Sequence, residues 1–262
     1  MENQVSYKKP YLLRELNTII AVAAREITVF FKTPSMMIMS FMLPLLMMGM
    51  IGGNMMGIPG AENLGEFMLV GMLVNMLFMI TAMGMTSLVD DHETDFNQEM
   101  LVAPVSRYSL VTGKIIGATF AAILSMVGTL IVGLIMNISL PIDQLLLILL
   151  ISPLICFTGG AMAMILIGLI KSNKTANFAV MTITMPQMFL SGAIIPINES
   201  NMILLALSRI MPMTYCVDLV RSITGVEVAM FNPLINLIAI IILTVICLVI
   251  GTFFYAKSEK NR

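Results

Sequence analysis

Six stretches of about 20 residues contain no Asp, Glu, Lys or Arg, and each is long enough to cross a bilayer as an α-helix. They cover residues 35–57, 67–89, 115–136, 145–170, 175–197 and 232–255. Composition agrees, because 58% of the 262 residues are hydrophobic and only 11% are charged, whereas a soluble domain has about 25% charged residues. The sequence therefore predicts an all-α polytopic membrane protein with six transmembrane helices.

The positions of the basic residues predict the orientation. The N-terminal segment, the second and fourth connections and the C-terminal tail hold all but two of the 14 Lys and Arg residues; the exceptions are Arg209 and Arg221. Because Lys and Arg resist translocation, we expect both termini and the connection 90–114 to be cytoplasmic in a plasma-membrane protein. A net charge of −1 gives no bulk attraction to nucleic acid, so no nucleic-acid partner is expected.

These observations divide the chain into a cytoplasmic N-terminal segment (1–34), a six-span domain (35–255) and a cytoplasmic tail (256–262). In residues 11–33, apolar side chains recur at steps of three and four: Leu12, Leu16, Ile19, Ile20, Ala23, Ile27 and Phe30 or Phe31. This spacing predicts an interfacial amphipathic helix lying flat on the inner leaflet. The alternative is a solvated helix docked on the protein's own inner face.

The sequence offers little for catalysis. A phosphate-binding loop ends in Gly-Lys-Ser/Thr, but the pair Gly113-Lys114 is followed by Ile115, and His92 is the single histidine. The predicted spans also lack the buried ionisable residue typical of ion-coupled carriers. We therefore expect a chain that is not an enzyme, binds no cofactor or metal, and takes its energy from elsewhere.

Sulfur-containing residues are numerous but not patterned. Thioethers bind Cu(I), yet the methionines of 35–57 point in every direction when stepped at about 100° per residue. The three cysteines, Cys156, Cys216 and Cys247, are widely separated. We interpret both residue types as apolar packing groups.

Uncharged polar residues in the spans are more informative about function than the sulfur-containing residues. In the fifth span Asn177, Thr184, Gln187 and Ser191 lie 7, 3 and 4 residues apart on one helical face, and Asn75 adds an amide in the second. Two interpretations are open. These residues line a substrate path or a seam between subunits, or they form hydrogen bonds between neighbouring helices. In the third span Gly117, Ala121, Ser125 and Gly128 form a small-residue face, which predicts close helix packing.

The cytoplasmic connection 90–114 has an acidic first half and then a short apolar patch that ends near Pro104. An exposed apolar patch among acidic residues suits docking to another protein; a solvated loop is the alternative.

Three segments resemble, in order, signatures of the type-2 ATP-binding-cassette (ABC) exporter permeases. They are QEMLVAPVSR at 98–107 followed by Gly113-Lys114, SGAIIP at 191–196, and PMTYCVDLVR at 212–221. The resemblance extends over essentially the whole chain. It implies a multidrug- or lipid-type exporter in which two permease chains, identical or related, associate with two separate cytoplasmic ATPase subunits that bind ATP and Mg.

The resemblance also implies roles for individual residues. The connection 90–114 would contain the coupling helix that contacts the ATPase, with Glu99, Met100, Leu101, Pro104 and Arg107 as candidates. The segment 198–231 would form short re-entrant helices that close an extracellular gate. The gate candidates are Gly192, Pro196, Pro212, Tyr215, Asp218 and Arg221.

The residues of that outer segment are compatible with this implication. Asp218 and Arg221 are three apart on one helical face and could form an ion pair, worth about 0.2–0.5 kcal/mol if exposed. Tyr215 is suited to anchoring at the membrane interface. An apolar, uncharged interior suits hydrophobic or amphipathic cargo, drug-like or lipid-like, surrounded by membrane lipid. The alternatives are a stand-alone secondary carrier or channel, and a membrane-anchoring scaffold.

Overall fold

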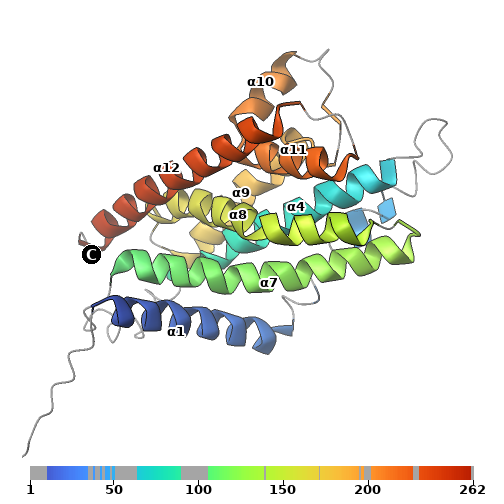
Figure 1. Ribbon diagram of the computed structural model, residues 1–262. Helices are drawn as coiled ribbons and strands as arrows, with labels where there is room; N and C mark the ends of the chain where they lie inside the picture. Colours follow the sequence, from blue (N-terminus) through green and yellow to red (C-terminus); the bar gives the residue numbers. More distant parts are fainter. Residues whose placement is uncertain are drawn as a thin grey trace, which may run out of the picture.

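The computed structural model describes residues 11–34, 64–89, 106–138, 140–170, 172–194, 196–197, 202–226 and 230–260, with a few positions between 38 and 50. Within these residues every regular element is a helix (Figure 1). The helices are α1 (Tyr11–Lys32), α4 (Leu64–Gly84), α7 (Arg107–Ile135), α8 (Ile142–Ile167), α9 (Asn173–Leu190), α10 (Met202–Ile210), α11 (Pro212–Thr224) and α12 (Pro233–Lys260). The all-α prediction is confirmed for this part of the chain.

Four segments of the described chain are long and apolar enough to cross a membrane: Gly65–Val89, Tyr108–Ile135, Ile142–Ile167 and Pro233–Tyr255. A fifth is added if α10 and α11, which meet at a bend of 96°, form one broken span. The four coincide with the predicted second, third, fourth and sixth spans. Most of the predicted first span, 35–57, lies outside the described residues, so the six-span layout stays a prediction.

The predicted fifth span corresponds to α9, but its predicted end was wrong. Helix α9 stops at Leu190, and the chain then turns through Gly192, whose φ of +78° is in the left-handed region. Glycine adopts this conformation without the steric cost that a Cβ would add. The helix therefore ends seven residues before position 197, and α9 is not among the four apolar segments.

The long helices alternate in direction. At one end of the bundle, here the Lys114 end, contacts join Ser87 to Lys114, Thr86 to Asn177 and Gly168 to Phe254. At the opposite end, here the Arg221 end, contacts join Phe67 to Arg221, Gln144 to Thr224 and Asp218 to Asn236. Helices α4, α8 and α12 thus run toward the Lys114 end, and α7 and α9 run away from it.

Helix α4 lies at the centre of the described bundle, and α7, α8, α9 and α11 pack against it. Glycines bring the backbones close: a Cβ at Gly71 would collide with the Ala193 carbonyl, and one at Gly159 with the Phe78 carbonyl. Small residues at such contacts are typical of packing between membrane helices. In the small-residue face predicted on α7, Gly117 packs against α1, since its Cβ would lie 2.6 Å from that of Glu26.

Helix α1 packs along the first half of α7 and runs in the same direction (Figure 1). Ile19 lies against Gly113, Ala23 against Gly117, and the rings of Phe31 and Phe120 are 6.5 Å apart. The helix is therefore docked on the protein, as in the alternative interpretation above. Large apolar side chains remain exposed on α1: Leu13, Leu16, Ile20, Val29 and Phe31. Its position on a leaflet stays a prediction.

Candidate functional site

A seam of uncharged polar residues runs between α4 and α9. The two helices are antiparallel, because Gly71 contacts Ala193 near one end of the seam and Thr86 Oγ1 donates to Asn177 Oδ1 over 2.9 Å at the other. Asn75 of α4 and Gln187 of α9 lie at levels between these two contacts along the helices. Their exposed fractions are 1% and 0%. The seam therefore brings two predicted site residues into the same buried stretch of the bundle.

The hydrogen-bonding groups of these two amides are poorly satisfied. Neither amide atom of Gln187 has a hydrogen-bond partner among the described residues, and the same holds for Asn75 Oδ1. Asn75 Nδ2 donates to the Met213 sulfur over 3.8 Å, and a thioether is a weak acceptor. Because a buried amide without a partner costs free energy, the seam holds donors and acceptors that a ligand could satisfy.

The other predicted seam residues form ordinary helix contacts. Thr184 and Ser191 are buried with Gln187, as the spacing predicts, but their hydroxyls donate to carbonyls of their own helix. Asn177 joins α9 to α4 through Thr86. Of the two interpretations given above, a hydrogen-bonding contact between helices therefore describes Asn177.

At the Arg221 end, one guanidinium connects three segments. Arg221 Nη2 donates to the carbonyl oxygens of Phe67 on α4 (3.4 Å) and Ala193 after α9 (3.3 Å). Its guanidinium carbon lies 3.5 Å from the centroid of the Phe67 ring, a cation–π contact. Arg221 is buried, so α11, α4 and the turn that follows α9 are held together at this end of the seam.

Asp218 connects α11 to the start of α12. Its carboxylate accepts the N–H groups of Met230 (2.7 Å) and Phe231 (3.0 Å) and the amide of Asn236 (2.7 Å). Asp218 and Arg221, considered above as an ion pair, are both buried, and each has partners that the spacing does not predict. Phe67 and Asn236 were missed because no local pattern relates them to α11.

The corner between α10 and α11 is fixed by Tyr215 and Pro212. Pro212 is the first residue of α11, a position that proline favours. Tyr215 donates its hydroxyl to the Arg209 carbonyl over 2.7 Å and stacks on Phe231. Of the remaining gate candidates, Gly192 makes the turn after α9, and Pro196 is exposed.

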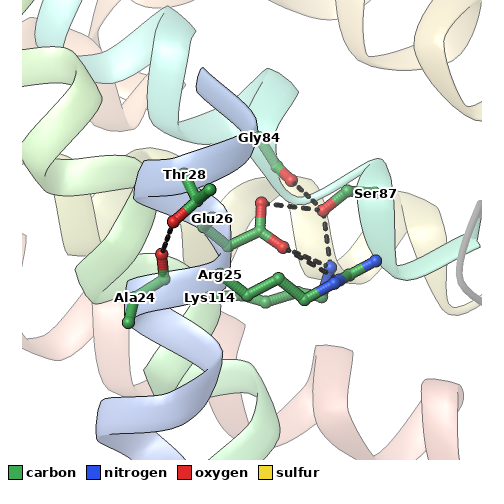
Figure 2. A network of polar contacts seen from close by, with 7 residues as sticks. All are labelled: Ala24, Arg25, Glu26, Thr28, Gly84, Ser87 and Lys114. Carbon is green, nitrogen blue, oxygen red and sulfur yellow. Dashed lines mark hydrogen bonds and ion pairs between the residues drawn. The ribbon is translucent and has the colours of Figure 1, made fainter. Parts of the chain in front are cut away.

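The Lys114 end contains an ion pair that the sequence analysis missed (Figure 2). Lys114 Nζ lies 2.9 Å from Glu26 Oε1 and donates to Ser87 Oγ over 2.6 Å. The Ser87 hydroxyl donates to the Gly84 carbonyl over 2.7 Å and lies 3.4 Å from Glu26 Oε2. The side chains of Lys114 and Glu26 are 2% and 11% exposed. The signal in the sequence was a charged residue at the edge of an apolar run, but Lys114 and Glu26 are 88 positions apart.

Most coupling candidates cannot be placed. Glu99, Met100, Leu101 and Pro104 lie outside the described residues, and Arg107 is the first residue of α7. Within the described ranges, no three His, Cys, Asp or Glu side chains form a group that could hold a metal ion.

Long apolar helices that alternate in direction along the chain and pack closely through glycine contacts define a multi-pass helical membrane protein. A family model described as ABC-2 type transporter matches residues 17–224, and the chain belongs to this family. It is accordingly the permease subunit of an ABC transporter, and the family implies association with ABC ATPase subunits. The match extends from α1 through α11. No curated protein matches the chain.

Proposed function

We propose that this permease belongs to an ATP-driven exporter that moves hydrophobic or amphipathic molecules, drug-like or lipid-like, out of the cell. Two permease chains would associate with two separate ATPase subunits, which bind the ATP and Mg. The family match over residues 17–224 is the observation that carries this proposal. The predicted spans contain no Asp, Glu, Lys or Arg, and Lys114, which the structure places in the apolar segment Tyr108–Ile135, is paired with Glu26. Both observations favour an external source of energy over ion coupling.

In this proposal the Lys114 end and both termini face the cytoplasm. Closure of the ATPase subunits on ATP would move the segment around Glu99 to Arg107, and the packed helices would transmit the displacement to the Arg221 end. There Arg221 and Asp218 hold α4, α11, α12 and the turn after α9 together. Opening an outward path would require these contacts to rearrange.

The buried seam supports the cargo class. Asn75 and Gln187 present amide groups in a mainly apolar interior. Uncharged donors and acceptors favour a molecule with a large apolar body and a few hydrogen-bonding groups. Among the described residues, the charge nearest this seam, that of Arg221, is already used in contacts with Phe67 and Ala193, so a highly charged cargo is disfavoured.

The test is reconstitution of the permease into liposomes with and without the ATPase that co-purifies with it. We expect transport of a fluorescent lipid or a hydrophobic dye only with the ATPase and hydrolysable ATP. Equal transport by the permease alone would favour a secondary carrier or channel. Absence of transport with the complete complex, for every cargo of this class, would favour a scaffold.

A further inference from the structure

Helix α1 contacts both flanks of the segment that connects α4 to α7. The described chain stops at Val89 and resumes at Ser106. Before the segment, Ser87 is in the polar cluster with Glu26 of α1. After it, the N–H of Ser106 donates to the Glu15 carboxylate, with distances of 3.3 and 3.2 Å to its two oxygens. The two acidic residues of α1 thus reach opposite ends of one connection.

The contact of Glu15 is electrostatically favourable. Ser106 immediately precedes the first turn of α7, and its own side chain makes no capping hydrogen bond there. A helix N-terminus carries free N–H groups and a partial positive charge, so a carboxylate is stabilised beside it. Glu15 is buried at this position. The carboxylate therefore fixes the start of α7 to α1.

The contact of Glu26 ties three elements together. Lys114 of α7 reaches both Glu26 of α1 and Ser87, which follows α4 (Figure 2). A lysine this deeply buried needs its charge compensated. Glycines bring the helices close, because a Cβ at Gly113 would lie 3.0 Å from the Ile19 carbonyl oxygen. The cluster thus has little room to shift as the helices move.

We propose that Glu15 and Glu26 are positioning residues for energy coupling: they hold the two flanks of the 90–105 segment against α1, so that displacement of this segment moves α4 and α7 together. This inference rests on the proposed function. It adds that α1 is a part of the coupling machinery and assigns the contacts through which it acts.

The first experiment measures the amount of cargo transported per ATP hydrolysed by the reconstituted complex. Both rates are normalised to the amount of assembled complex. We expect Glu15→Ala and Ser87→Ala to lower this ratio about fivefold or more, with ATP hydrolysis retained. Glu15→Gln keeps an oxygen acceptor for Ser106 and should restore the ratio. Glu66→Gln, an exposed acid at the Arg221 end, is the matched control. An unchanged ratio in both alanine variants would overturn the inference.

The second experiment needs no ATPase. Spin labels at Leu13→Cys and Tyr108→Cys, both exposed, report the distance between α1 and the start of α7. Glu15→Ala should broaden the distance distribution, and Glu15→Gln should leave it narrow. An unchanged distribution in Glu15→Ala overturns the inference even if ATP-driven transport is established. A broader distribution supports the inference even if the chosen cargo is not transported. Absence of transport would count against the proposed function alone.

Discussion

Gln187 combines a structural cost with the chemistry of a binding group. Its amide is fully buried, and neither polar atom has a described hydrogen-bond partner. An apolar residue of similar size would suit this environment better. Unsatisfied polar groups in folded proteins call for a specific explanation, and in a permease a hydrogen-bonding cargo is one. This interpretation separates stability from transport at a single position.

Gln187→Leu should raise stability while lowering transport. Removing the unsatisfied amide is expected to stabilise the fold by about 1–3 kcal/mol, measured as a higher thermal unfolding midpoint in detergent. ATP-dependent transport of a hydrogen-bonding cargo should fall. Gln144→Leu is the matched control, because Gln144 donates to the Thr224 carbonyl over 2.8 Å and its loss should destabilise. A fall in stability for Gln187→Leu would contradict this interpretation.

Asp218→Asn should weaken the connection between α11 and α12. The carboxylate accepts three hydrogen bonds. In the asparagine variant an N–H₂ group replaces one carboxylate oxygen and faces at least one of these donors, so that hydrogen bond is lost. We expect a loss of about 1–3 kcal/mol, seen as a lower unfolding midpoint and as faster proteolysis after Thr224. Asp143→Asn, at an exposed residue of the same end, should change neither.

Which of these residues the sequence could predict depends on their separation along the chain. Helical spacing alone places Asn177, Thr184, Gln187 and Ser191 on one face, but it does not say that Thr184, Gln187 and Ser191 are buried, which the structure shows. The pairing of Lys114 with Glu26 joins residues 88 positions apart, and Arg221 reaches Phe67 over 154. Tertiary packing of α1 against α7, and of α4 against α11, creates these contacts, and no local pattern encodes that packing.

At the scale of helices, close packing depends on where each glycine faces. Gly159 and Gly160 are adjacent on α8 and point toward different neighbours. A Cβ at Gly159 would collide with the Phe78 carbonyl of α4, whereas one at Gly160 would lie 2.9 Å from the Ile115 side chain. A backbone cannot move aside as easily as the end of a side chain.

Gly159→Ala should therefore be more damaging than Gly160→Ala. Overpacking of this kind costs about 1–3 kcal/mol, and we expect Gly159→Ala to reach the upper part of that range. Both variants would be compared by thermal unfolding of the purified protein. Equal effects would show that α4 and α8 separate without cost, which would contradict the rigid packing that coupling requires.

Hydropathy predicted where the apolar helices lie better than where they end. The second, third, fourth and sixth predicted spans coincide with apolar helices because uninterrupted apolar runs define them. The end of α9 was missed because residues after Leu190 stay apolar although the chain turns at Gly192. Composition does not distinguish a helix from a buried turn.

At the scale of the whole molecule, lysines gather at one end of the fold, whereas Arg209 and Arg221 lie at the other. The Lys114 end contains the cluster of Glu26 and Lys114 and the exposed Lys174 and Lys257. The exposed acids Glu66 and Asp143 begin helices at the opposite end. Because the helices alternate in direction, charges from distant segments gather at one end. The orientation expected from these lysines, with the Lys114 end inside, stays a prediction.

Thiol labelling would test this orientation. In intact cells, a membrane-impermeant maleimide should label Glu66→Cys and Asp143→Cys but not Lys174→Cys or Lys257→Cys; inside-out vesicles should give the reverse. The unmodified protein, with two buried cysteines and one half-buried, gives the background. If Lys174→Cys is labelled from outside, the Lys114 end is extracellular. The coupling segment would then be out of reach of a cytoplasmic ATPase, and the energy source proposed for this permease would have to be abandoned.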